Sequence, residues 1–391
     1  QWHTFYGAQG YSDTASDVAL DASDNIYISF SSSANWLGSG SAAPVNPYSG
    51  GSVDAGVLKL DAGGTYQWHT FLGGSGAEYS TGIAVHHLSV YVTGYSDAAF
   101  LGPGSNPPVN SYKGKKDILV FGLSSSDGAY SWHTFDGDSR VDDLGRDVAL
   151  DSSAYPYIIG NGGDWAGPAG QLPLHLATEA EGNVVILKLG ANGGYFWHTF
   201  YGASCDADAI SIQGDAVVGV GDCYSGWIGA SGAAPLHAYA DSLDVFALQL
   251  NRNGAYQWHT FMGGSLFDAA EDVVVGPDGM VYVTGYGSAW NGPEGQAPAH
   301  AHSGGYDAMV FALLPSGHYL WHTFYGSAVN DYAHGLGLDN YGYLYAGGHS
   351  ALSWQGDGGA NPLHAHSSSG DFFVMRLNNL VKRVYAPLVR K

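Results

Sequence analysis

The tetrapeptide Trp-His-Thr-Phe, first met at residues 2–5 (WHTF), decides the fold because it returns throughout the chain. Its six copies begin at Trp2, Trp68, Trp132, Trp197, Trp258 and Trp321. Successive copies are 61 to 66 residues apart, so six units account for nearly the whole chain of 391 residues. A fixed period of this size is typical of a repeat architecture, in which equivalent units stack on their neighbours.

Each unit has the periodicity of β-strands. A turn such as GPDG at 276–279 separates two short apolar runs, and a loop of about 20 residues then leads to a third run, such as DVFALQL at 244–250. A tight Asn253-Gly254 turn leads into the fourth run, which carries the tetrapeptide. Four antiparallel strands per unit, repeated six times, predict an all-β protein, a six-bladed β-propeller of four-stranded antiparallel blades.

The phase of the repeat predicts how the propeller closes. The chain begins on a fourth strand, Trp2–Tyr6, and its last recognisable strand is a third one, FFVMRL at 372–377. We therefore expect the N-terminal strand to complete the last blade and so remove an open sheet edge. The expected organisation is a propeller over residues 1–378 followed by a basic, apolar C-terminal tail over residues 379–391.

The repeat resembles a known family. WHTFYG at 2–7, a following acidic residue, an apolar strand that ends in Asp, and a strand of the form YVTG, as at 282–285, are similar to the bacterial β-propeller repeat called SBBP. The resemblance covers residues 1–378. It implies a propeller fold and an extracellular location, and it implies no particular activity.

Composition excludes two classes of function. The chain has 35 acidic and 13 basic residues, a formal net charge of −22, which excludes a nucleic-acid binder because phosphate neutralisation needs Lys and Arg. No apolar stretch approaches the roughly 18 residues of a membrane-spanning helix, so we expect no membrane insertion. The sequence begins at Gln1 without Met, which we interpret as a mature chain whose leader was removed. The expected location is secreted, either extracellular or at the cell surface.

The two cysteines support this location. Cys205 and Cys223 each lie nine residues from Gly214, which is in the turn between two predicted strands. Equal offsets place two residues opposite each other in an antiparallel hairpin, so a disulfide is predicted, as in many secreted proteins. The alternative is a pair of free thiols.

Two sets of aromatic residues recur. The strand histidines lie too far apart to share one ion, so we expect them to form a packing and hydrogen-bonding layer between blades. The loops after the second strand carry tryptophans, with Phe100 in the second unit. These tryptophans are either a sugar-stacking surface or plugs that hold each long loop in place. The histidines are His3, His69, His133, His198, His259 and His322, and the loop tryptophans are Trp36, Trp165, Trp227, Trp290 and Trp354.

An acidic residue recurs just before the first strand of every unit. The six carboxylates could surround the mouth of a central channel and bind Ca²⁺. We expect the protein to require no other cofactor. Alternatively, each carboxylate caps backbone N–H groups of its own turn. The residues are Asp13, Glu78, Asp143, Asp206, Asp268 and Asp331.

The sequence predicts a function only as a class. Catalysis needs a few unlike groups in a unique arrangement, whereas this chain mostly repeats like groups, so we expect no enzyme and name no catalytic residue. A basic, β-prone tail on an acidic body predicts docking by strand addition, in the same chain or in a neighbouring copy. The tail residues expected to carry assembly are Lys382, Arg383, Val384, Tyr385, Leu388 and Arg390.

The favoured interpretation is a non-enzymatic, secreted structural or interaction module whose main partner is itself, in a fibre or a surface layer. The alternative is a lectin-like carbohydrate binder that uses the repeated long loops. A propeller enzyme, either a hydrolase or a lyase, is the least favoured alternative.

Overall fold

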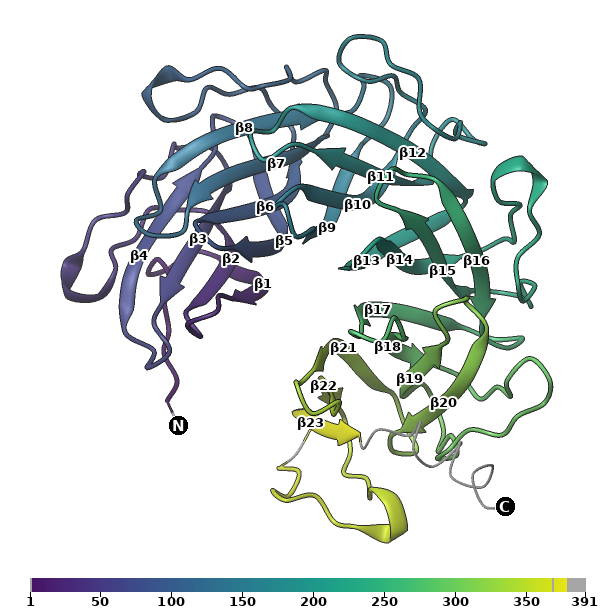
Figure 1. Cartoon of the computed structure of the whole chain (residues 1–391). Coiled ribbons are helices and arrows are strands. Elements are labelled where there is room, and N and C mark those ends of the chain that lie inside the picture. The colour runs from purple at the N-terminus through teal and green to yellow at the C-terminus, as the bar shows by residue number, and fades with distance from the viewer. Residues whose placement is uncertain (1, 368, 378–391) are drawn as a thin grey trace. The chain divides into compact units, whose positions relative to one another are not determined.

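The computed structural model describes residues 2–367 and 369–377, and within them the regular structure is almost entirely β (Figure 1). The chain divides into two compact units, residues 1–207 and 208–391, with the boundary inside strand β13. No helix in the described ranges is long and apolar enough to cross a membrane.

The strands of the first unit form three blades. They are β1 (Asp13–Leu20), β2 (Ile26–Ser32), β3 (Asp54–Leu60), β4 (Tyr66–Leu72), β5 (Glu78–His86), β6 (Ser89–Ser96), β7 (Asp117–Ser124), β8 (Tyr130–Asp136), β9 (Leu144–Leu150), β10 (Pro156–Gly162), β11 (Asn183–Leu189) and β12 (Tyr195–Ala203). Single-turn 3₁₀ helices η1 (Ser39–Ser41) and η2 (Pro103–Ser105) lie in the first two long loops.

The second unit continues the pattern. Its strands are β13 (Cys205–Gln213), β14 (Ala216–Cys223), β15 (Asp244–Asn251), β16 (Tyr256–Met262), β17 (Asp268–Val275), β18 (Val281–Gly287), β19 (Asp307–Leu313), β20 (Tyr319–Tyr325), β21 (Asp331–Leu338), β22 (Leu344–Ser350) and β23 (Asp371–Leu377), with 3₁₀ helices η3 (Ala230–Gly232) and η4 (Asp357–Gly359).

The six sheets confirm the predicted fold class, an all-β six-bladed β-propeller. Five sheets have four strands in the order of the sequence, joined by antiparallel hairpins, and the sixth consists of β21, β22 and β23 in the described residues. The predicted closing strand, Trp2–Tyr6, is not part of any sheet in this structure.

Successive blades within each unit pack face to face through apolar side chains. In the first unit, Val57 and Trp68 of the first blade share a buried cluster with Phe121 of the second blade. In the second unit, Val245 and Trp258 of the fourth blade share one with Phe311 of the fifth. Because a β-blade has two apolar faces, each blade depends on a neighbour to bury the second one.

The tryptophan of the tetrapeptide reaches the next blade. A Cβ atom built on Gly128, in the β7–β8 turn, would lie 2.6 Å from the ring of Trp68. Gly193 and Gly317 receive Trp132 and Trp258 in the same way. Each of these glycines has a φ between 72° and 81°, so the position needs glycine for both its backbone conformation and the space above it.

A disulfide is also confirmed. Both cysteines are disulfide-bonded, and since the chain has only two, Cys205 pairs with Cys223. The disulfide takes the position that a hydrogen-bonded pair of polar side chains has in the second blade. The backbone N–H of Cys205 donates to the carbonyl of Gly182, as that of Glu78 donates to Val53, and Cys223 pairs with Asp244 on the next strand as Ser96 pairs with Asp117. The side chains of Ser96 and Glu78 are hydrogen-bonded at the corresponding place, 2.9 Å apart.

We predict that the double variant Cys205→Ser/Cys223→Ser lowers the free energy of unfolding by about 3 kcal/mol, because the unfolded chain loses a cross-link that closes a short loop. Replacing the bond by Cys205→Asp/Cys223→Ser should recover part of this loss, since it rebuilds the carboxylate–serine pair. Urea denaturation measures both, with Asp206→Asn as a control at an exposed neighbour. Equal stability of the two double variants would contradict the equivalence.

Candidate functional site

The loop aromatic residues stack on the fourth-strand histidines. The ring centroids of Trp165 and His198 are 4.0 Å apart, and their planes differ by 9°. The other stacks are Trp36–His69, Phe100–His133, Trp227–His259 and Trp290–His322. The four tryptophans of these stacks are at most 9% exposed, so they plug the loops, and the exposed ring faces that a sugar-stacking surface needs are missing at these positions. The expectation that the histidine layer lies between blades is also corrected for five of the six residues, because each of these five histidines packs on the long loop of its own blade.

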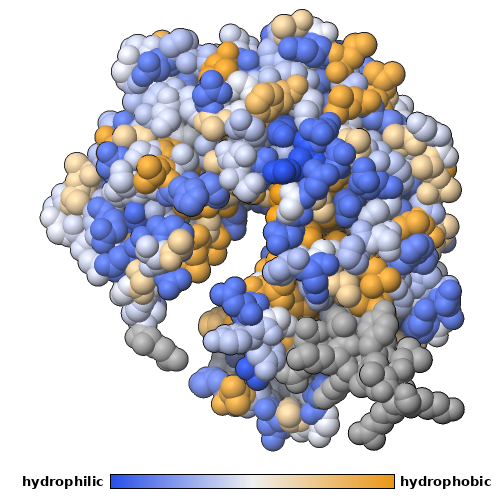
Figure 2. All heavy atoms as spheres, in the orientation of Figure 1, coloured by the Kyte–Doolittle hydropathy of each residue, from blue (hydrophilic) through white to orange (hydrophobic). Residues whose placement is uncertain are grey.

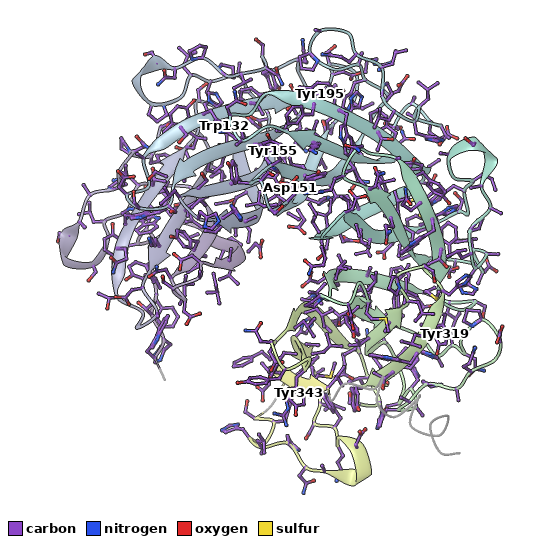
Figure 3. The ribbon with its side chains drawn as sticks, viewed as in Figure 1. Trp132, Asp151, Tyr155, Tyr195, Tyr319 and Tyr343 are labelled. Atoms are coloured by element: carbon purple, nitrogen blue, oxygen red, sulfur yellow. The ribbon has the colours of Figure 1, made fainter. Side chains whose placement is uncertain are left out.

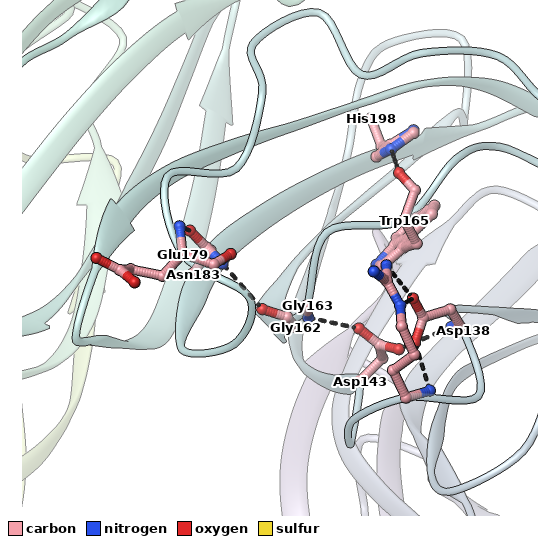
Figure 4. Close-up of polar contacts among 9 residues, drawn as sticks. Asp138, Asp143, Gly162, Gly163, Trp165, Glu179, Asn183 and His198 are labelled. Carbon is pink, nitrogen blue, oxygen red and sulfur yellow. Dashed lines mark hydrogen bonds and ion pairs between the residues drawn. The ribbon is translucent and has the colours of Figure 1, made fainter.

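The hydrogen bonds of each histidine show which ring nitrogen carries the hydrogen. Nε2 of His198 lies 2.9 Å from the carbonyl oxygen of Trp165, which can only accept, so Nε2 carries the hydrogen (Figure 4). Nδ1 is then the acceptor for the hydroxyl of Tyr195, 2.7 Å away. Tyr195 and Tyr319, which has the same role for His322, lie on equivalent fourth strands (Figure 3). The arrangement holds a neutral imidazole.

Burial also favours the neutral form of these histidines. Desolvation lowers the pKa of His198 to about 4, and it lowers the pKa of His69, His133, His259 and His322 to about 4 as well. A neutral, fully hydrogen-bonded imidazole has no free nitrogen for a metal ion. These histidines are structural groups that hold the long loops.

The long loops also protect the fourth strands. The backbone N–H of Val45 donates to the carbonyl of His69 (2.8 Å), and that of Phe71 donates to the carbonyl of Asn46 (3.0 Å). The loops of the second to fifth blades make the first of these bonds through Val109–His133, Leu174–His198, Leu236–His259 and Ala299–His322. A strand edge that would otherwise be free to pair with another chain is thus covered in five blades.

The sixth blade lacks these contacts. Its strand β23 has no partner on one side among the described residues, and Phe372 and Val374 are 85% and 71% exposed. Leu363, which corresponds to Val45, is fully exposed, and Trp354 has no fourth-strand histidine to stack on in the part of the chain that the structure describes. These side chains, with His364, line a groove of about 780 Å³ beside β23, which is drawn in yellow in Figure 1.

A further copy of the fourth-strand sequence lies on the first blade. Trp2 covers Gly64 in the β3–β4 turn, as Trp68 covers Gly128 one blade later. Residues 2–6 therefore occupy the place that a fourth strand takes against the following blade. Trp2 and Phe5 remain 48% and 90% exposed. In the space-filling view, hydrophobic residues are interspersed among hydrophilic ones on the face shown (Figure 2).

Five of the six predicted carboxylates cap the turn before a first strand. Asp143, for example, accepts from the backbone N–H groups of Asp138 (2.9 Å) and Gly163 (3.0 Å), as Figure 4 shows. The equivalent turn donors are Ala8 for Asp13, Gly74 for Glu78, Gly264 for Asp268 and Ser327 for Asp331. The sixth assignment, Asp206, is wrong as a member of this set, because Asp206 is exposed and Cys205 has the equivalent position. The turn of this unit is shorter, which shifted the alignment by one residue.

The carboxylates meet a second set of acids that the sequence analysis missed. Asp54, Asp117, Asp244 and Asp307 begin third strands and are buried beside the next blade. Burial raises the pKa of Asp54 to about 6 and that of Glu78 to about 7. The recurrence of Asp at the start of the third run was visible in the sequence and could have revealed this set.

Other predicted features are not brought together. In the described ranges there is no group of three or more His, Cys, Asp or Glu side chains that could hold a metal ion. The predicted assembly residues Lys382, Arg383, Val384, Tyr385, Leu388 and Arg390 lie outside the described residues.

Comparison with known proteins gives only weak likenesses. No protein-family model and no curated protein matches the chain, so membership of the SBBP family stays a prediction. Among solved structures, the Pan2 WD40 domain of Neurospora crassa is similar at 10% identity over 85% of each chain, with a TM-score of 0.41. The quinohemoprotein alcohol dehydrogenase of Comamonas testosteroni has 13% identity over 87% of this chain and 64% of its own (TM-score 0.43). A protein of unknown function from Dyadobacter fermentans has 11% identity over 91% and 94% (TM-score 0.39). Each likeness is too weak to carry a function over.

We predict that the five stacked histidines stay neutral, with hydrogen on Nε2, as the pH falls from 8 to about 5. Their folded-state pKa of about 4 lies below the ordinary 6.5, so their contribution to stability is complete above pH 6.5 and is lost as the pH falls towards 4. The buried carboxyl groups, whose pKa is raised, act with the opposite sign. For this reason ¹⁵N NMR of the imidazoles is a cleaner measurement than unfolding. Titration of these five rings near pH 6.5 would contradict the assignment.

Proposed function

We propose that the protein is a non-enzymatic structural or interaction module that works outside the cell by self-assembly, with a fourth strand from one copy completing the sixth blade of another. The observation that carries the proposal is the edge of β23 that no described strand covers, next to a loop whose partner strand is not among the described residues. The spare tetrapeptide at residues 2–5 has the same four residues as the strands that fill this place in the other five blades.

The chemistry of the groove matches this strand. In the other blades the tetrapeptide supplies a histidine ring to the loop aromatic residue and a carbonyl to the loop N–H. In the sixth blade Trp354 and the N–H of Leu363 are the corresponding groups. His3 of an incoming strand would stack on Trp354 and offer its carbonyl to Leu363, and strand pairing would cover Phe372 and Val374.

Assembly of this kind is head to tail. Residues 2–6 and the edge of β23 are different surfaces, so each copy has one donor and one acceptor, and such a contact propagates into a fibre when the rotation does not close. The disulfide supports a location outside the reducing cytosol. The predicted role of residues 380–391 as a connector is a separate route to assembly.

We expect the native protein to form polymers by light scattering and electron microscopy, and an excess of the peptide WHTFYG (residues 2–7) to disperse them, because it fills the groove. A scrambled peptide is the control. Phe5→Asp on the donor and Trp354→Ala on the acceptor should each give particles of one chain, 41.0 kDa. Tyr341→Asp changes an equally exposed aromatic residue outside the groove and should leave polymers intact.

Truncation of residues 380–391 separates the two routes. Polymers that survive truncation but not Phe5→Asp support strand donation, whereas the reverse result assigns the connection to the tail and overturns strand donation. Particles of 41.0 kDa for the native protein would contradict self-assembly altogether, since each chain would then fill its own sixth blade.

A further inference from the structure

Pairs of buried carboxylates occupy four junctions between successive blades. In each pair, an Asp at the start of a third strand meets the acid that caps the first strand of the next blade. A Cβ atom built on Gly73 would lie 2.6 Å or less from an oxygen of both Asp54 and Glu78. Cβ atoms built on Gly137, Gly263 and Gly326 would lie 2.5 to 3.1 Å from an oxygen of each acid of the other pairs. The pairs are Asp54–Glu78, Asp117–Asp143, Asp244–Asp268 and Asp307–Asp331, and all eight residues are at most 1% exposed.

In each pair, hydrogen bonds account for three of the four carboxylate oxygens, and one oxygen has no partner. Glu78 accepts from the backbone N–H of Gly74 (2.8 Å) and from the hydroxyl of Ser96 (2.9 Å). Asp54 uses Oδ2 to accept from the N–H of Ser49 (2.5 Å), but its buried Oδ1 has no partner. The same atom, Oδ1, is unpartnered in Asp117, Asp244 and Asp307. A buried carboxylate oxygen without a partner is costly, and the same oxygen lacks a protein partner at four equivalent places, where a bound ion, a water or a proton would satisfy it.

The junction between the third and fourth blades is a natural comparison. There Asn183 replaces the third-strand Asp, and Cys205 replaces the capping acid. The Asn183 amide is satisfied locally. It donates to the carbonyl of Glu179 (2.9 Å), which lies beside it in Figure 4, and it accepts from the N–H of Thr178 (3.2 Å). Both acids are absent together where a disulfide is present. The two carboxylates of a pair therefore act as one unit.

No protein cation neutralises the pairs. None of the eight carboxylates forms an ion pair with Lys or Arg in the part of the chain that the structure describes. Two carboxylates that share a buried site repel each other unless a proton or a metal ion lies between them. The net charge of −22 also attracts cations to the protein as a whole.

We propose that each of the four carboxylate pairs binds one Ca²⁺ ion that joins two successive blades. The donors present are oxygens alone, which suits a hard cation, and extracellular Ca²⁺ modules work with dissociation constants of about 10⁻⁴ to 10⁻³ M. Two carboxylates balance the charge of one Ca²⁺. The sites lie within a single chain, so this inference is independent of self-assembly.

The test uses the full chain after treatment with EDTA. Titration calorimetry with Ca²⁺ should give four equivalents, and 10 mM Ca²⁺ should raise the melting temperature by roughly 5 °C or more. Asp244→Asn should remove one equivalent and part of the thermal shift. This variant should fold, because the chain itself has Asn183 at the equivalent position. Asp241→Asn, an exposed acid three residues upstream, is the matched control and should bind as the native protein does.

The opposite results would overturn the inference. If the native chain shows neither Ca²⁺ binding nor a thermal shift, and becomes more stable on acidification alone, then each pair shares a proton instead. Equal stoichiometry for Asp244→Asn and Asp241→Asn would place bound Ca²⁺ elsewhere. Neither outcome depends on whether the protein forms polymers.

Discussion

The fourth strand of each blade is the element on which the rest of the structure depends. In three blades its tryptophan packs on a glycine turn of the following blade, and in five blades its histidine stacks on the aromatic residue of its own long loop. Its backbone then pairs with the returning loop. One tetrapeptide thus joins a blade to its neighbour, holds a loop of about 20 residues and covers a sheet edge. Among the described residues, the sixth blade has no such strand, and there its long loop has no histidine to stack on and its outer sheet edge is not covered.

Four junctions between successive blades share one arrangement of buried acids, and a fifth differs from it. A glycine-rich turn must be held where the chain passes from one blade to the next, and four such junctions do so with two buried carboxylates. The junction with Asn183 and Cys205 has a disulfide nearby instead. This disulfide joins β13 and β14 of the fourth blade, so it fixes the hairpin that carries Cys205.

The sequence was sufficient for the blades but not for their junctions. The period of the tetrapeptide and the turns between apolar runs predict six antiparallel sheets, and the offsets of Cys205 and Cys223 from Gly214 predict their bond. Burial of the loop tryptophans was not decidable, because it depends on each loop folding back over its own blade. Asp206 was misassigned because a shorter turn moved the capping position to Cys205. The partner acids, such as Asp54 for Glu78, were missed because they come from a different blade and meet only after two blades stack.

Residues 2–6 have the sequence of a fourth strand but belong to no sheet among the described residues. We propose that they pair with β23 of a neighbouring copy. The most direct measurement is a cryo-electron microscopy map of native particles in which the side chains of Trp2, His3 and Phe5 are resolved. We expect these residues to lie along β23 of a neighbouring copy, with the ring of His3 stacked on Trp354 of that copy. Density for the same residues along β23 of their own chain, or a different segment along that edge, would contradict it.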